Sequence, residues 1–246
     1  MLSMHSLVQR LRQLLLALLL ILCAAWISGE AFQWLLRWRA VRLLADIQTL
    51  QVNRSTWPDA QRIAEKWAQW GNPKPGCSAE ACTVQFNLIQ TLPPFLVGSP
   101  DAGARNVLPR IVDHAGLRSA AARAGFTVEH GIVTARWFGE QVTLPVREWG
   151  SPNGYIPYLS ASSEQTSHFR EIAGDSRLLH PNRMIQHKES YVQLTYSPSE
   201  DPAEQSALMG FRFSCLTQLR PCESVGDLLP EGQRMLLELK LTPPSR

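Results

Sequence analysis

An unbroken apolar run near the N-terminus constrains the fold of this chain more than any other feature. Leu14–Ile27 reads LLLALLLILCAAWI and follows Arg10 and Arg12. A run of this length fits the apolar core of a cleavable signal peptide, whereas a helix that crosses a bilayer needs about 20 residues. Apolar side chains continue to Leu36 with few interruptions, so an uncleaved helix also has the necessary length.

An uncleaved anchor divides the chain into three parts. Residues 1–12 form a short cytoplasmic tail, 13–34 a transmembrane signal anchor in the lipid bilayer, and 35–246 a single extracytoplasmic domain. Cleavage after the small residues Ala24 and Ala25 is the alternative. Beside an anchor, aromatic rings are favoured at the membrane interface. The residues expected there are Trp26, Phe32, Trp34 and Trp38.

The cysteines outside the apolar run form two local pairs. Cys77 and Cys82 lie in GCSAEAC, and Cys215 and Cys222 in CLTQLRPC. Because zinc sites usually need Cys-x-x-Cys, these spacings favour two small disulfide loops. Other pairings, free buried thiols and a metal site remain the alternatives. Disulfides persist in oxidising compartments, so they favour a cytoplasmic N-terminus at a bacterial inner membrane, with the domain in the periplasm or outside.

Charge is nearly balanced outside the N-terminal region. Residues 1–54 carry six Arg against Glu30 and Asp46, and the rest of the chain has 18 basic and 19 acidic residues. Basic residues flank the apolar run on both sides, so the positive-inside rule alone does not orient it. No basic run follows residue 54, and we therefore expect no nucleic-acid partner.

Hydrophobic periodicity predicts an α+β fold with a mainly antiparallel sheet. Spacings of three and four over 36–50 indicate that the membrane helix continues as an amphipathic helix, and a second helix over 57–70 packs on the sheet. His130-Gly131 fits a two-residue hairpin turn. Helices first and strands later is typical of this class. Strands are expected at 84–88, 126–129, 132–138, 142–146, 191–196, 210–215 and 235–241.

No motif of a familiar enzyme class is complete. Gly174-Asp175-Ser176 is similar to the nucleophile block of GDSL-type hydrolases, but the Asp-x-x-His partner block is missing, so a turn is expected. His180 and His187 offer two metal ligands without a third. Asp201 and Glu204 lie in SPSEDPAE, which is typical of a solvated loop. The sequence predicts no catalytic residue, no metal site and no cofactor.

Several segments together resemble uncharacterised bacterial proteins with a single membrane anchor. They are RAVRLLADIQTLQVNRSTWPDAQRIAEKWAQWG, GCSAEAC, and RFSCLTQLRPC followed by DLLPEG. The resemblance covers most of the chain beyond the anchor. It implies an anchored, disulfide-bearing domain, and it brings no activity, cofactor or catalytic residue with it.

These features favour a binding or scaffold module at the cell envelope, with another envelope protein as a candidate partner. Loops expected at 91–106 and 149–168 are where such function concentrates. Aromatic residues of the second loop form a candidate binding surface, namely Trp149, Tyr155 and Tyr158.

Two other functions remain open at this stage. An envelope hydrolase is favoured if a histidine converges with an acid in a pocket, the candidates being His168, His180 and His187. A subunit of a larger membrane assembly is favoured if residues 31–51 pair with a partner helix.

Overall fold

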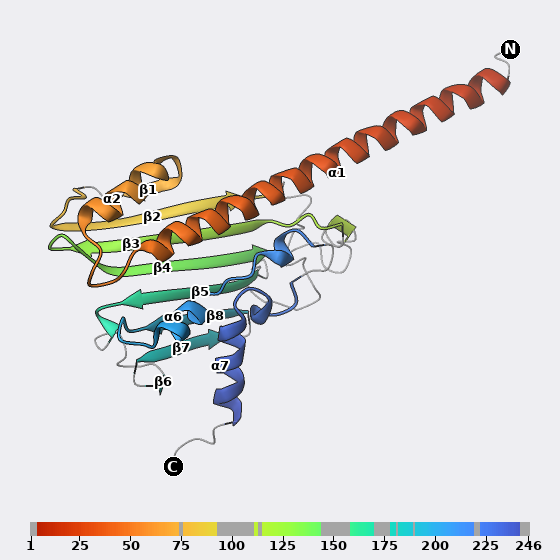
Figure 1. Ribbon diagram of the computed structural model, residues 1–246. Coiled ribbons are helices and arrows are strands. Elements are labelled where there is room, and N and C mark those ends of the chain that lie inside the picture. The colour runs from red at the N-terminus through yellow and green to blue at the C-terminus, as the bar shows by residue number, and fades with distance from the viewer. Residues whose placement is uncertain are drawn as a thin grey trace.

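The computed structural model describes residues 4–73, 76–92, 111–112, 115–143, 158–169, 178–180, 182–188, 190–218 and 222–241. Within them the chain forms the predicted α+β fold (Figure 1). The α-helices are α1 (Met4–Thr49), α2 (Trp57–Lys66), α6 (Pro202–Leu208) and α7 (Pro230–Leu241). Short 3-10 helices are η1 (Ala68–Trp70), η4 (Ser214–Leu216) and η5 (Val225–Asp227). The strands are β1 (Gly71–Pro73), β2 (Ala81–Gln90), β3 (Ala120–Glu129), β4 (Ile132–Thr143), β5 (Tyr158–Thr166), β6 (Leu178–His180), β7 (Arg183–Lys188) and β8 (Tyr191–Tyr196).

The strands form one mixed sheet in the order β1-β2-β3-β4-β5-β8-β7-β6. Neighbouring strands run antiparallel except β5 and β8, which are parallel. The hairpin of β3 and β4 turns at His130 and Gly131, whose φ angles are 50° and 80°. Positive φ at both positions is what a two-residue hairpin turn with the right twist needs, so the predicted hairpin is confirmed.

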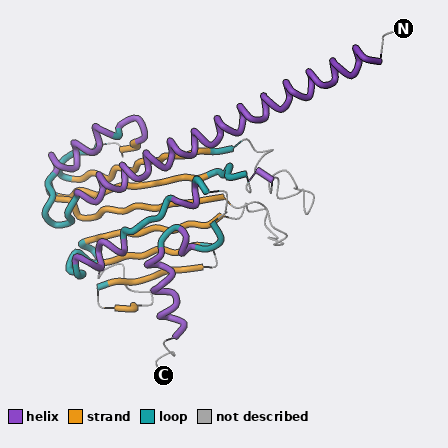
Figure 2. The backbone as a smooth tube through the Cα atoms, turned by 45° about the vertical axis from the view of Figure 1, so that its right-hand side comes forward, coloured by secondary structure: helices purple, strands orange, loops and turns teal. Residues whose placement is uncertain are grey.

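The described helices pack on one face of the sheet. Figures 1 and 2 show α2, α6, α7 and the C-terminal half of α1 on the same side of the strands. The amphipathic half of α1 contacts β2, β3 and β4. Its buried residues include Leu36, Ala40, Leu43 and Ile47. Facing them in β2 is every second residue, Cys82, Val84, Phe86 and Leu88. We call this side of the sheet the core face and the other side the open face.

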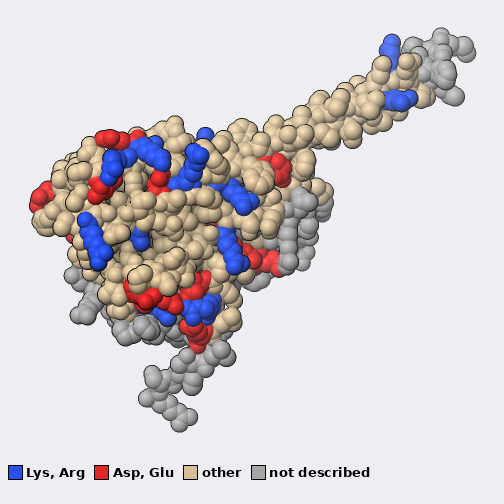
Figure 3. All heavy atoms as spheres, in the orientation of Figure 1, with Lys and Arg blue, Asp and Glu red and all other residues tan. Residues whose placement is uncertain are grey.

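α1 is one uninterrupted helix of 46 residues that lies in two environments. Its first half projects away from the domain with exposed side chains, and its second half packs on the sheet (Figure 2). Figure 3 shows the projecting half almost free of charged atoms between its outer end and the domain. Among the described residues, α1 is the one helix long and apolar enough to cross a membrane, a property that a signal sequence shares.

A buried arginine fixes the C-terminal end of α1 to the sheet. Arg136 of β4 donates from Nη1 to the carbonyl oxygens of Gln48 at 2.6 Å and Leu50 at 2.5 Å, and from Nε to Gln165 Oε1 at 2.8 Å. Carbonyls at a helix end lack partners within the helix, and a cation suits the negative end of the helix dipole. Burial lowers the pKa of Arg136, while the neighbouring Tyr196 raises it. These hydrogen bonds join the C-terminal end of α1 to β4 and β5.

α2 begins and packs as predicted. The backbone N–H of Thr56 donates to Asp59 Oδ2 at 3.0 Å, and this hydrogen bond is the main reason why the pKa of Asp59 is lowered. Ala60 and Trp67 are buried against the sheet. The indole N–H of Trp67 also donates to Asp46 Oδ2 of α1 at 2.7 Å, so the two helices are held together.

The strand predicted at 235–241 is wrong, because these residues belong to α7. The alternation in LELKL covers only five residues, whereas Pro230 and the acidic Glu231 start a helix. Arg234 pairs with Glu231 and Glu238 at the spacings that adjacent helical turns provide.

The strand predicted at 210–215 is also wrong. The segment crosses the core face as coil and then enters η4. Its alternating Phe211 and Phe213 pack on Phe138 with ring centroids 4.8 Å and 5.7 Å away. The period of two therefore reflects burial of both rings on β4, without strand pairing.

The loop predicted at 149–168 is wrong over its second part, because 158–166 is β5, between β4 and β8. Ser and Ala fill much of this strand, so it lacks the β-branched and aromatic residues that usually reveal one. The strand predicted at 142–146 is the end of β4, which runs to Thr143. Residues 93–106 and 144–157 lie outside the described residues.

Candidate functional site

The open face of the sheet is polar along its central strands. In β5, Tyr158, Ser160, Ser162 and Glu164 are partly exposed, while the alternate residues Leu159, Ala161 and Ser163 are buried on the core face. The same alternation places Gln85 and Asn87 of β2 and Trp137, Gly139 and Gln141 of β4 on the open face. Buried apolar packing does not explain these residues, so this face is available for contact with a ligand.

A hollow of about 360 Å³ lies on this face across β2 to β8. Neutral residues that can form hydrogen bonds dominate its lining, together with one aromatic ring, three charged residues and two small residues. The lining residues are Gln85, Gln141, Ser160, Ser162, Ser163, Gln193, Trp137, Arg123, Glu140, Glu164, Ala121 and Gly139. Amides and hydroxyls both donate and accept hydrogen bonds, so the lining suits a ligand with many hydroxyl or amide groups.

Trp137 forms the aromatic part of the hollow because a glycine lies opposite it. Gly125 pairs with Trp137 across β3 and β4. A Cβ atom at Gly125 would lie 2.7 Å from the indole Nε1 of Trp137 and 2.5 Å from the carbonyl oxygen of Val84. The ring therefore lies over the bare backbone of Gly125, as aromatic residues do over strand glycines.

The charged groups that are at least partly exposed on the open side of the hollow are Arg123 and Glu164, because the third charged lining residue, Glu140, is buried. Arg123 is exposed, and burial raises the pKa of the Glu164 carboxyl above its ordinary value. One cation and one carboxylate leave the hollow without a dominant charge. A strongly anionic or cationic ligand is therefore a poor match for it.

Of the predicted aromatic binding residues, only Tyr158 lies in the described part of the chain. It is 40% exposed at the start of β5. Tyr191 of β8 lies near it, since burial and the Tyr158 hydroxyl together raise the pKa of Tyr191. Both positions follow the open-face alternation of their strands. Trp149 and Tyr155 lie outside the described residues.

The predicted disulfide between Cys77 and Cys82 is present, with Cα atoms 4.4 Å apart. It closes the turn before β2, and Cys82 is buried in the core. Cys222 is also disulfide-bonded and buried. The side chain of Cys215, its predicted partner, lies outside the described side chains.

The aromatic residues predicted at a membrane interface are all exposed on α1. Trp26, Phe32, Trp34 and Trp38 are 45%, 63%, 56% and 50% exposed. The guanidinium of Arg37 lies 5.1 Å from the ring centre of Trp34. That of Arg42 lies 3.7 Å from the ring centre of Trp38. Each pair presents an aromatic face together with a cation.

The histidines do not assemble a catalytic site within the described residues. His168 pairs through Nε2 with Glu129 Oε2 at 3.0 Å, and both side chains are about two-fifths exposed, away from the hollow. The side chains of His180 and His187, and all of Gly174-Asp175-Ser176, lie outside what the structure describes. No cluster of three metal-ligating side chains occurs among the residues that the structure describes.

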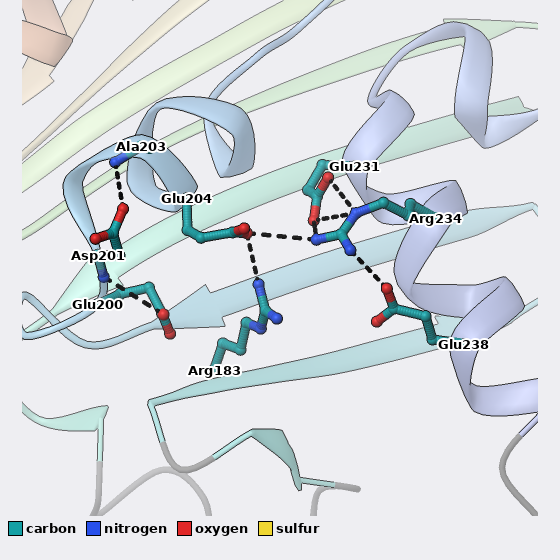
Figure 4. Close-up of polar contacts among 8 residues, drawn as sticks. All are labelled: Arg183, Glu200, Asp201, Ala203, Glu204, Glu231, Arg234 and Glu238. Atoms are coloured by element: carbon teal, nitrogen blue, oxygen red, sulfur yellow. Dashed lines mark hydrogen bonds and ion pairs between the residues drawn. The ribbon is translucent and has the colours of Figure 1, made fainter.

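The solvated loop predicted over 197–204 is present up to Asp201, whereas Glu204 lies in α6, which begins at Pro202. Asp201 caps α6 by accepting from the backbone N–H of Ala203 at 2.8 Å. Glu204 accepts from Arg183 of β7 at 2.8 Å and from Arg234 of α7 at 3.3 Å (Figure 4). Arg234 also binds the carboxylates of Glu231 and Glu238, and the pKa of this arginine is raised mainly by its hydrogen bonds to Glu231. These ion pairs join α6, α7 and β7.

A carboxyl also lies on the core face of the central strand β4. Glu140 is fully buried, and neither of its carboxyl oxygens has a hydrogen-bond partner. The paired residues on the two neighbouring strands are Ala122 and Ala161, both small and apolar. Burial raises the pKa of Glu140 well above its ordinary value, so the neutral acid is favoured in the fold.

The sequence alone missed the open-face hollow. Its lining comes from five strands, and only three of its residues, Gln85, Trp137 and Gln193, lie in strands that the periodicity predicted. A usable signal was the alternation of Ser160, Ser162 and Glu164 with Leu159 and Ala161, which has a period of two but weak apolar contrast. Comparison with family models, curated proteins and solved structures finds no match for this chain.

Proposed function

We propose that the protein is a membrane-anchored binding module of the cell envelope whose open sheet face binds a neutral saccharide. The observation that carries this proposal is the hollow itself, where one indole ring lies among amide and hydroxyl side chains. Saccharides present hydroxyls to such groups and an apolar ring face to an aromatic side chain.

The anchor in this proposal is the projecting half of α1. Its exposed leucines face outward on every side of the helix, which is unfavourable in water and favourable in lipid. The disulfide between Cys77 and Cys82 supports an oxidising compartment for the domain. With the N-terminus in the cytoplasm, the hollow lies where envelope glycans are accessible.

Binding is tested with the full chain in detergent micelles, by screening neutral oligosaccharides, including glycan-strand fragments of the cell wall, for a change in tryptophan fluorescence. We expect binding that Trp137→Ala abolishes. Trp34→Ala is the control, since Trp34 is an exposed indole on α1 that does not line the hollow, and this variant should retain binding. No response to any saccharide, or unchanged binding after Trp137→Ala, contradicts the proposed ligand.

Topology is tested separately on intact spheroplasts with a membrane-impermeant maleimide. Labelling of Cys77 and Cys82 only after reduction supports a disulfide-bonded domain outside the cytoplasm. Labelling only after lysis, without a reductant, contradicts both the compartment and the anchor orientation.

A further inference from the structure

We propose that the domain itself rests in the lipid headgroup layer, through a short segment that packs beside α1. This segment, which we call the shoulder, comprises residues 111–112 and 115–118. The inference rests on the proposed membrane anchor and adds a second, independent lipid contact from a different part of the chain.

The shoulder is hydrogen-bonded to α1 at the C-terminal end of the apolar run and just beyond it. The indole N–H of Trp26 donates to the carbonyl oxygen of Ala115 at 3.0 Å. Two turns later, Gln33 Nε2 donates to the carbonyl oxygen of Arg118 at 3.2 Å. Between them, a Cβ atom at Gly29 would lie only 2.6 Å from Leu117 Cδ2, so the glycine permits close approach. The level of the shoulder along α1 is therefore fixed.

The length of α1 places that level at the membrane surface. From Arg10 to Glu30 the helix rises about 30 Å at 1.5 Å per residue, which matches the hydrocarbon thickness of a bilayer. If the span lies between these charged residues, Trp26 to Gln33 occupy its last turn and the start of the headgroup layer. The shoulder, bonded to the same two residues, lies at the same depth.

The chemistry of the shoulder suits that depth. Ile111 is 58% exposed, and its apolar neighbours in the segment are Val112, Ala115 and Leu117. Two backbone hydrogen bonds lie within the segment, from Ala115 N–H to the Ile111 carbonyl at 2.9 Å and from Leu117 N–H to the Val112 carbonyl at 3.0 Å. Such internal pairing is what a non-aqueous surrounding demands of a backbone.

Gly116 and Arg118 complete this arrangement. Gly116 has a φ of 88°, a backbone conformation that favours glycine, and it lies between Ala115 and Leu117, the donors of these two hydrogen bonds. Arg118 is only 3% exposed and donates from Nη1 to the carbonyl oxygen of Gln218 at 2.6 Å. The one cation of the shoulder thus points into the domain, Val112 is buried, and the exposed apolar side chain of Ile111 remains for lipid.

Two exposed isoleucines allow a matched test of this inference. Ile111 belongs to the shoulder, whereas Ile132 is 42% exposed beside the β3–β4 turn, at the end of β4 remote from the shoulder. Each is replaced by cysteine in full-length protein that also carries Cys23→Ser, because Cys23 is the free, exposed cysteine. Both variants are labelled with an environment-sensitive fluorophore under non-reducing conditions and reconstituted into vesicles of phosphatidylcholine and phosphatidylglycerol.

Lipids that carry a nitroxide near the headgroup should quench the label in Ile111→Cys several-fold more than in Ile132→Cys, and aqueous iodide should show the reverse order. Equal access of iodide to both labels overturns the inference, as does equal quenching of both by the lipid nitroxide. Alkaline extraction of the same vesicles distinguishes a failure of the anchor, which releases the protein, from a failure of the shoulder, which leaves it embedded.

Discussion

The two faces of β4 have opposite compositions although they alternate along one strand. Toward the helices, Phe138 is completely buried between Phe211 and Phe213, and Glu140 is buried beside it. Toward the open face, Trp137, Gly139 and Gln141 remain partly exposed around the hollow. The core face provides the free energy of folding, while the open face is free to be selected for binding.

Each face of β4 also holds one residue whose polarity is unusual for that face. The core face holds an unpaired carboxyl, Glu140, in a place where apolar groups are expected. The open face holds a large aromatic ring, Trp137, supported by the backbone of Gly125. Substitution of Glu140 should therefore change the stability of the domain, whereas substitution of Trp137 should change ligand binding.

The largest expected effect is on the core face. Phe138→Ala removes a fully buried ring and should lower the free energy of unfolding by about 3–5 kcal/mol. Urea unfolding of the full chain in micelles, followed by proteolysis, measures it. Trp137→Ala on the opposite face should cost about 1 kcal/mol or less, since its ring is only half-buried. Comparable losses for the two variants would show that the faces contribute equally.

An intermediate loss of stability is expected when a methyl group is added to a glycine on the open face. Gly125→Ala should destabilise the domain by about 2 kcal/mol, because the new Cβ meets the Val84 carbonyl oxygen and the Trp137 ring below contact distance. Gly139→Ala is its matched control. There the nearest atom, Ser162 Cβ, is 3.3 Å away, and the change should stay within about 0.5 kcal/mol. Equal thermal shifts for the two variants would refute this account of Trp137.

The smallest expected effect depends on pH. The folded state holds the Glu140 proton at pH values where the unfolded chain has lost it, because burial raises the pKa in the fold. The stability of the wild-type protein is therefore undiminished by this group below its ordinary pKa and falls as pH rises toward the folded pKa. Glu140→Leu should stabilise the domain by on the order of 1 kcal/mol near neutral pH.

The pH series is measured on the difference between wild type and variant, so that other titrating groups cancel. The gain from Glu140→Leu should grow between acidic and neutral pH, and Glu140→Gln should show the same trend without the benefit of added apolar contact. A gain that is constant with pH would mean that folding does not shift the pKa of Glu140.

Local patterns in the sequence predicted those elements whose signals are contained in one segment. The continuous α1, the capped start of α2 and the His130-Gly131 hairpin each follow from nearby residues. The Cys77–Cys82 disulfide follows likewise from a short loop. Prediction failed where the signal was weak or shared, as in the Ser-rich β5 and in α7, whose five-residue alternation imitates a strand.

The sequence by itself determined the long apolar helix and the α+β class, because length, composition and periodicity along one segment suffice for them. Tertiary structure alone decided that Trp137 lies over Gly125, that Glu140 is buried between Ala122 and Ala161, and that the shoulder meets α1 at Trp26. Each of these depends on which strands and loops become neighbours, a choice made by packing the whole core and not by any local stretch of residues.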